Sequence, residues 1–170
     1  QKTAYEIRNC DWSSDVCSSD LATFEIHQQK EIIETKHREL TDSINYAERI
    51  QRSFLASEEV LKNHFTEHFV FFQPKDVVSG DFYWAEQLSN GDMAILCGDS
   101  TGHGVPGAIM SLLNIMTFEK AVESSQNPSE ILYNTRKMII HRLNKGNERV
   151  DRSEGMDCCL MTFKIGRAHV

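Results

Sequence analysis

The chain has 170 residues, with 18 Lys and Arg against 25 Asp and Glu, and its formal net charge is −7 at pH 7. This acidic balance argues against nucleic-acid binding through phosphate contacts, and no apolar run approaches the ~20 residues that a membrane helix needs. The five cysteines are odd in number and irregularly spaced. That pattern fits neither a disulfide framework nor a closed zinc site.

Both ends of the chain read as foreign sequence. In one coding, the DNA for residues 165–170 translates on its opposite strand as Asp-Val-Cys-Ser-Ser-Asp, the hexapeptide at residues 15–20. We therefore interpret residues 1–21 and 165–170 as translated sequencing adapter and exclude them from the fold. Different codons in the nucleotide read would contradict this interpretation, and a native disordered head is the alternative. The cysteines that remain, Cys97, Cys158 and Cys159, suit a reducing compartment such as the cytoplasm.

Residues 22–57 predict a long signalling helix. From residue 24 to residue 55 the chain lacks Gly and Pro and is rich in Glu, Lys, Gln and Arg, which favour helices. Apolar residues recur there every seven positions: Ile26, Ile33, Leu40, Ala47 and Phe54. This imperfect heptad predicts a coiled coil, with a homodimer formed through residues 24–55. A single amphipathic helix packed on its own domain is the alternative, and both can hold if residues 44–55 pack on the domain.

The following elements are expected in the order strands, two helices, strand. Apolar runs at 69–72, 82–84 and 93–97 predict strands, and Asn90-Gly91 predicts a two-residue hairpin turn between the last two. Pro106 suits the first turn of a helix over 108–123, which is apolar nearly all round and is therefore expected to be buried. Asn127 caps a second helix, and residues 158–163 predict a last strand.

Two carboxylates meet at the open end of the predicted hairpin. With a two-residue turn at 90–91, Asp81 lies opposite Ser100 and Asp99 lies opposite Phe82. Cross-strand neighbours are about 5 Å apart, so the two acids repel each other unless a cation compensates. Hard divalent ions take carboxylate and backbone carbonyl oxygens. The pair therefore predicts a Mg²⁺ or Mn²⁺ site, and the alternative is that both acids only cap turns.

The loop Gly102-His-Gly-Val-Pro-Gly107 has a competing interpretation. G-x-G-x-x-G after a strand and before a helix is the dinucleotide-binding fingerprint. Two details count against nucleotide binding here. Asp99-Ser-Thr separates the strand from the first glycine, and Asp99 places negative charge beside a pyrophosphate.

Three ordered segments resemble the successive signatures of one phosphatase family. They are residues 74–84 (PKDVVSGDFYW), 98–108 (GDSTGHGVPGA) and 155–160 (GMDCCL), and residues 50–55 (IQRSFL) resemble the element that precedes the catalytic domain. They are similar to the SpoIIE-like branch of the metal-dependent PPM, or protein phosphatase 2C-like, Ser/Thr phosphatases. The resemblance implies an α/β (α+β) fold, a partial α-β-β-α sandwich preceded by a long helix, with two Mn²⁺ or Mg²⁺ ions in the complete domain.

The resemblance also implies roles for individual residues. Asp99 matches the aspartate that bridges both metal ions, and the backbone carbonyl of Ser100 matches the ligand beside it. Asp81 matches an early acidic residue that acts through water, and Asp157 is a further metal candidate that alternatively orients its loop. The metals lower the pKa of a water and hold the phosphoryl group for attack.

Two further candidates concern the substrate. His103 is the candidate proton donor to the leaving oxygen, with a loop histidine bonded to backbone as the alternative. Lys75 is the candidate phosphate contact, with a solvated lysine as the alternative. The implied function is a bacterial signalling phosphatase that acts on phosphoserine or phosphothreonine of a regulator such as an anti-anti-sigma (STAS-like) factor, downstream of a sensor domain in the parent protein.

The family's later Asp-Gly motif and last aspartate have no counterpart in this sequence. We therefore expect residues 58–164 to be the N-terminal part of a phosphatase domain, and this fragment to be inactive. The alternative is a non-catalytic signalling or dimerisation module with a degenerate phosphatase domain.

Overall fold

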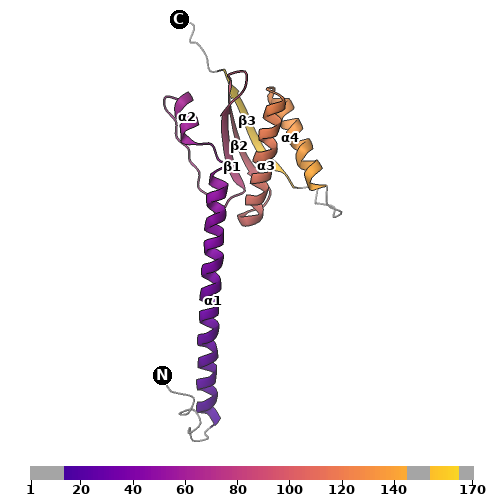
Figure 1. Cartoon of the computed structure of the whole chain (residues 1–170). Helices are drawn as coiled ribbons and strands as arrows, with labels where there is room; N and C mark the ends of the chain where they lie inside the picture. Colours follow the sequence, from indigo (N-terminus) through magenta and orange to yellow (C-terminus); the bar gives the residue numbers. More distant parts are fainter. Residues whose placement is uncertain (1–13, 145–153, 165–170) are drawn as a thin grey trace. The chain divides into compact units, whose positions relative to one another are not determined.

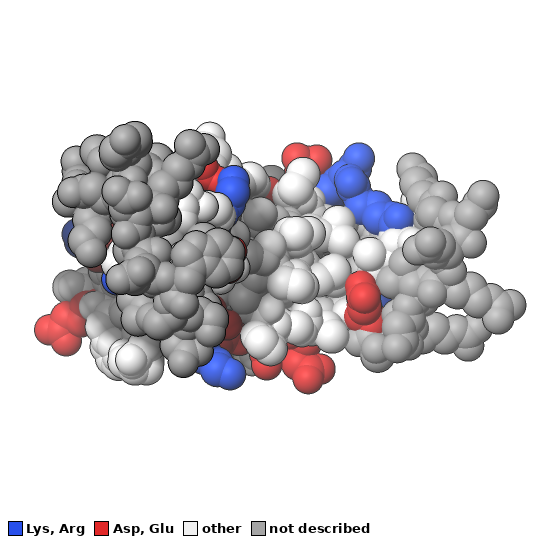
Figure 2. Space-filling view, turned by 90° about the horizontal axis from the view of Figure 1, so that it is seen from below, with Lys and Arg blue, Asp and Glu red and all other residues white. Residues whose placement is uncertain are grey.

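The computed structural model describes residues 14–144 and 154–164, with side chains from residue 22 onward. The chain divides after Ser43 into two units, which are considered separately here. Among the described residues, no helix is both long and apolar enough to cross a membrane. Figure 2 shows both acidic and basic side chains among the described residues on the face seen from below.

The first unit is helical. Helix α1 runs from Ser14 to Arg52, which confirms one long helix but ends it three residues earlier than expected. Its first residues fall in the segment that we ascribe to adapter sequence, and that interpretation stays a prediction. The heptad residues Ile26, Ile33 and Leu40 are 61%, 65% and 60% exposed. The seam of the predicted coiled coil is thus open to a partner on this part of α1.

The second unit contains the last turns of α1 and a three-stranded antiparallel sheet in the order β1-β2-β3 (Figure 1). The strands are β1 (Asp81–Gln87), β2 (Met93–Ser100) and β3 (Met156–Phe163). The expected strand at 69–72 does not form, and this segment runs outside the sheet without strand structure. Its exposed phenylalanines, Phe69 and Phe71, have no strand partner to pair with among the described residues.

The hairpin turn between β1 and β2 has three residues, not two. Leu88 N–H donates to the Asp92 carbonyl at 2.7 Å, and Gly91 N–H donates to the Leu88 carbonyl at 2.8 Å. Gly91 has φ +87°, the left-handed conformation that closes a three-residue hairpin at low steric cost. The extra loop residue shifts the predicted register by one, so Asp81 pairs with Asp99 and not with Ser100.

Helices α3 (Gly104–Ser124) and α4 (Pro128–Leu143) cover one face of this sheet (Figure 1). The main core forms between them and the strands, and Trp84 of β1 meets Phe118 of α3 edge to face at 4.9 Å between ring centroids. Asn127 caps α4 as predicted, because its side chain accepts from Ser129 N–H at 3.0 Å. Helix α2 (Glu58–His64) packs through Leu61 on Ala85 and Met93, which belong to a second, smaller cluster.

Helix α3 is not buried all round, contrary to the expectation from its apolar sequence. Ile109 and Met116 are 63% and 48% exposed, whereas Ser111, Asn114 and Thr117 are fully buried. The reason is hydrogen bonding, since these polar side chains find partners on the segments that α3 covers or on their own helix. The observed mixture of helices and one antiparallel sheet confirms the predicted fold class.

Candidate metal centre

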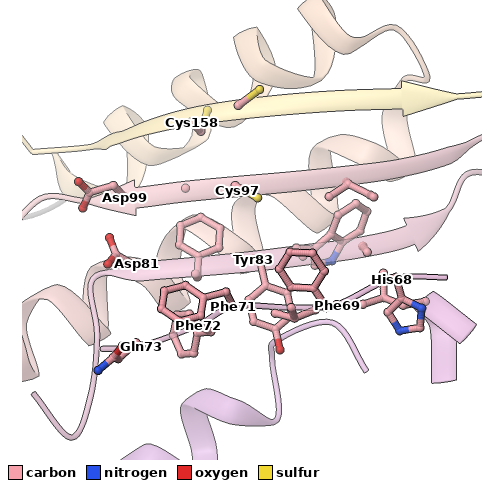
Figure 3. Close-up of a pocket in the computed structure, with 18 of the residues that line it drawn as sticks. His68, Phe69, Phe71, Phe72, Gln73, Asp81, Tyr83, Cys97, Asp99 and Cys158 are labelled. Carbon is pink, nitrogen blue, oxygen red and sulfur yellow. The ribbon is translucent and has the colours of Figure 1, made fainter. Parts of the chain in front are cut away.

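Three aspartates form a row across one end of the sheet. The strand register pairs Asp81 with Asp99, and Asp99 with Asp157. Residues that lie directly opposite each other in antiparallel strands project to the same face. Figure 3 shows Asp81 and Asp99 side by side, where β1 begins and β2 ends. The three-residue turn is what creates this row, because a shift of one residue would put Asp81 and Asp99 on opposite faces.

The hydrogen-bond pattern makes Asp81 and Asp99 the closer pair. Backbone bonds join Ser100 to Gly80 and Leu88 to Asp92, and these pairs alternate with Asp81–Asp99 along the ladder. Asp81 and Asp99 therefore form a non-hydrogen-bonded pair, whose Cα atoms lie about 4.5 Å apart. The neighbouring bond from Thr101 N–H to the Gly155 carbonyl makes Asp99–Asp157 the wider type, about 5.5 Å.

The electrostatics of the pair favour a bound cation. Burial raises the pKa of Asp81 above its ordinary value, and hydrogen bonding and charge repulsion from Asp99 raise it further. A proton shared between facing carboxylates, or a divalent cation, relieves this repulsion. The donor set is hard oxygen, which Mg²⁺ and Mn²⁺ prefer.

The aspartate row fits a metal ion only in part. Within the described residues, no group of three His, Cys, Asp or Glu side chains is close enough to hold an ion. Asp81 and Asp99 can supply two carboxylates to one ion, while Asp157 stands one strand farther along the row. Further ligands would have to come from backbone carbonyls such as that of Ser100, from water, or from residues outside the described part of the chain.

A small cavity of about 240 Å³ collects most of the predicted site residues. Its lining includes Lys75, Asp76, Asp81, Asp99 and His103. His103 Nδ1 lies 3.4 Å from Asp76 Oδ2, and the His103 side chain is 82% exposed. The structure therefore brings the candidate phosphate contact and the candidate proton donor to the same cavity as the two facing carboxylates.

Ser100 is buried and does not line this cavity. Ser100 is 2% exposed, and its hydroxyl accepts from Asn114 Nδ2 at 2.9 Å. A Cβ atom built on Gly80 would lie 2.8 Å from the Ser100 carbonyl oxygen, which places that oxygen beside the residue that precedes Asp81. The role of this carbonyl as a metal ligand stays a prediction.

A larger cavity of about 940 Å³ adjoins the aspartate row (Figure 3). Residues 68–73 form one wall, and Tyr83, Cys97 and Cys159 on the strands form the other. Cys158 and Cys159, on β3, are exposed. Among the described residues, no second sheet covers this face of the strands.

Sequence reasoning missed three residues that the structure places around the site. Asp76 pairs with His103, Gln51 reaches the segment before Asp81, and Asn114 contacts Ser100 and, at 3.4 Å, the Gly155 carbonyl. Gln51 and Asp76 both lie inside segments that resemble family signatures, which was the only available signal. Asn114 lies outside those segments, so the sequence gave no such signal for it.

The sheet topology argues against the dinucleotide interpretation of the loop at 102–107. That fingerprint belongs to a parallel βαβ unit, whereas both neighbours of β2 are antiparallel to it. The glycines have a local role here, since Gly102 and Gly104 adopt positive φ at the entry to α3.

Comparisons with known proteins point to one family. Residues 89–170 match the family model of stage II sporulation protein E (SpoIIE). Among solved structures, the SiaA-PP2C domain of Pseudomonas aeruginosa is similar, with 32% sequence identity and a TM-score of 0.63. The match covers 73% of this chain and 48% of that chain, so the chain spans about half the length of the solved domain. A comparison with curated proteins finds no match.

The structural match agrees with the arrangement of helices on an antiparallel sheet. Together, the sequence match and the structural match show that this chain is similar to the SpoIIE family and to a solved PP2C domain.

Proposed function

We propose that the protein to which this chain belongs is a metal-dependent serine/threonine phosphatase of bacterial signalling. The observation that carries this proposal is the facing pair Asp81 and Asp99, set in a row with Asp157 on a sheet of the PP2C type. Mn²⁺ or Mg²⁺ ions, two in the complete domain, would supply Lewis-acid activation of water and of the phosphoryl group.

In this proposal the chain's own residues hold the ions and handle the substrate. Asp81, Asp99 and the Ser100 carbonyl would hold the metal, with Asp157 as an additional ligand. Lys75 lines the cavity beside the two carboxylates, where its ammonium group would bind a phosphate oxygen. His103 would donate a proton to the leaving serine or threonine oxygen, and Asp76 orients its ring.

We further propose that this chain alone is inactive, because its described residues hold only part of a metal site. With Mn²⁺ and a phosphoserine peptide, we expect no turnover above the metal-only background. A longer protein that includes this chain and the rest of the domain should show Mn²⁺-dependent release of phosphate. Turnover by the 170-residue chain would contradict the proposed inactivity. A longer protein that binds Mn²⁺ without turnover would instead support a non-catalytic relay.

The proposed substrate is a phosphorylated signalling protein, such as a STAS-like anti-anti-sigma regulator, and a sensor domain upstream would control the activity. We place the domain in the cytoplasm, since free thiols persist in reducing compartments. These assignments rest on the family resemblance.

We also propose that two copies of the chain associate through residues 24–55. Ile26, Ile33 and Leu40 are exposed at heptad spacing, as a coiled-coil seam requires. Ile33→Glu with Leu40→Glu should convert a dimer into a monomer in sedimentation velocity, because charges would be buried in the seam. Thr35→Glu, off the seam, is the matched control and should leave the dimer intact. A wild-type monomer at all concentrations would rule out this association.

A further inference from the structure

Gln51, in the last turn of α1, is a buried amide that the proposed mechanism does not use. Its side chain is 4% exposed. Its Nε2 donates to the Ser79 carbonyl at 2.5 Å and to Ser111 Oγ at 2.8 Å, and its Oε1 accepts from Ser79 N–H at 3.0 Å. One side chain therefore binds both backbone polar groups of a residue 28 positions farther along the chain.

The contacts of Ser79 lead directly to the aspartate row. Ser79 Oγ accepts from Asp81 N–H at 3.0 Å, so Gln51 is linked to Asp81 through a single residue. Gly80, which lies between Ser79 and Asp81, accepts a hydrogen bond through its carbonyl from Ser100 N–H at 3.2 Å. Ser100 directly follows Asp99 in β2. The segment 79–81 thus has hydrogen bonds to α1 on one side and to the end of β2 on the other.

Space is tight where this segment faces the loop at 100–102. A Cβ atom on Gly80 would lie 2.6 Å from the Gly102 carbonyl oxygen and 2.8 Å from that of Ser100. These are backbone atoms, which cannot move aside as the end of a side chain can. The loop at 100–102 and Gly107 of α3 therefore lie against Gly80, and Gln51 binds the neighbouring Ser79 from α1.

We propose that Gln51 is a positioning residue that holds Asp81 directly opposite Asp99. The value of this positioning rests on the proposed metal-dependent function, whereas the hydrogen bonds of Gln51 are observed independently of it. Breaking a buried amide's hydrogen bonds leaves the Ser79 backbone groups unpaired, which favours movement of the segment away from its native place. The end of the helix that precedes the domain thereby becomes part of the candidate metal centre.

The test is an NMR measurement on the metal-free chain. In non-hydrogen-bonded antiparallel pairs the facing Hα protons are close, so Asp81–Asp99, Tyr83–Cys97 and Ala85–Ile95 should each give a strong Hα–Hα Overhauser effect. In Gln51→Met, which keeps side-chain length and removes the hydrogen bonds, the Asp81–Asp99 signal should be lost. The other two signals should persist, because those pairs lie deeper in the ladder.

Two matched variants separate positioning from general stability. Ser111→Ala removes one partner of Gln51 but leaves both bonds to Ser79, and Ile139→Val trims the buried face of α4 far from the segment. Both should keep all three signals. Should Gln51→Met not fold, Gln51→Glu takes its place under the same criterion, since it cannot donate to the Ser79 carbonyl.

Mn²⁺ alone serves as the second probe. Loss of an outer-shell partner lowers metal affinity about 10–100-fold. Gln51 acts on Asp81 one residue farther away, so Gln51→Met should raise the Mn²⁺ concentration that broadens the Asp81 and Asp99 amide signals by up to that factor. Persistence of all three Overhauser effects in Gln51→Met would overturn the proposal, and so would loss of all three. If the wild-type chain shows no broadening, the proposed metal function fails, while the Overhauser effects still decide the role of Gln51.

Discussion

Replacing Asp99 by asparagine is expected to stabilise the metal-free chain at pH 7 and to remove its affinity for Mn²⁺. The substitution keeps the shape of the side chain but ends the repulsion between Asp99 and Asp81, which face each other across β1 and β2. Like charges directly opposite in a sheet are destabilising, and such pairs contribute about 0.2–1 kcal/mol. The same substitution removes the carboxylate at the centre of the aspartate row, which would bind the ion directly. The loss of affinity should therefore exceed the cost of losing an outer-shell partner, which is about 10–100-fold.

Repulsion between Asp81 and Asp99 should also make the stability of the wild-type chain depend on pH. The pKa of Asp81 is raised in the folded state, so the folded chain binds this proton more tightly than the unfolded chain does. Binding of this proton therefore stabilises the folded chain fully below pH 3.8, the ordinary pKa of Asp. The stabilisation is lost as the pH rises from 3.8 through the raised pKa of Asp81. In Asp99→Asn the loss across this window should be smaller.

Urea unfolding between pH 4 and pH 7, with and without Mn²⁺, measures both effects. Asp42→Asn is the matched control, because it removes one exposed carboxylate from the part of α1 that belongs to the other unit of the chain. It should change neither the pH dependence nor the Mn²⁺ response. Lower stability of Asp99→Asn at pH 7 without metal would show that the two carboxylates do not repel each other. Unchanged Mn²⁺ affinity would remove Asp99 from the metal site.

Gly107→Ala is expected to destabilise the domain, although alanine is the better helix former. A Cβ atom there would lie 2.4 Å from the Gly102 carbonyl oxygen, 2.8 Å from its carbonyl carbon and 3.1 Å from Gly80 Cα. All three are backbone atoms, so α3 must separate from Gly102 and from Gly80, the residue before Asp81. Such overpacking costs about 1–3 kcal/mol, which outweighs the roughly 0.5–1 kcal/mol that a helix gains from Gly→Ala.

Thermal unfolding of Gly107→Ala beside Gly155→Ala isolates this packing effect. Gly155 has no atom within 4 Å of a built Cβ and does not have positive φ, so its substitution should be close to neutral. Because the α3 entry loop also borders the small cavity, Gly107→Ala should weaken Mn²⁺ binding as well. A Gly107→Ala chain as stable as wild type would mean that α3 and the loop at 100–102 are not in close contact.

Local patterns in the sequence were sufficient for most of the secondary structure. Asn127 and Pro128 marked the start of α4, and the two apolar runs around Asn90-Gly91 marked the hairpin. The turn length was predicted wrongly, because Asn-Gly also suits a three-residue loop with Gly91 in the left-handed position. That one residue decides whether Asp81 and Asp99 share a face, so the geometry of the site could not follow from the turn motif alone.

Burial depended on tertiary partners that no local pattern contains. Ile109 and Ser111 are separated by two positions, yet the isoleucine is exposed and the serine is fully buried. Ser111 is buried because it accepts a hydrogen bond from Gln51, which lies 60 residues away in the chain. In the same way, the contact between Asp76 and His103 depends on two loops that meet only in the folded domain.

The sequence by itself determined the class of fold, the two carboxylates at the end of a hairpin and the resemblance to a phosphatase family. These follow from short-range spacing and from the identity of residues in motifs, both of which are properties of the chain. Only the tertiary structure decided that Asp157 joins Asp81 and Asp99 in one row and that Gln51 binds the segment before Asp81. Both depend on strand register and on helix packing, where contacts between distant residues set the free-energy balance.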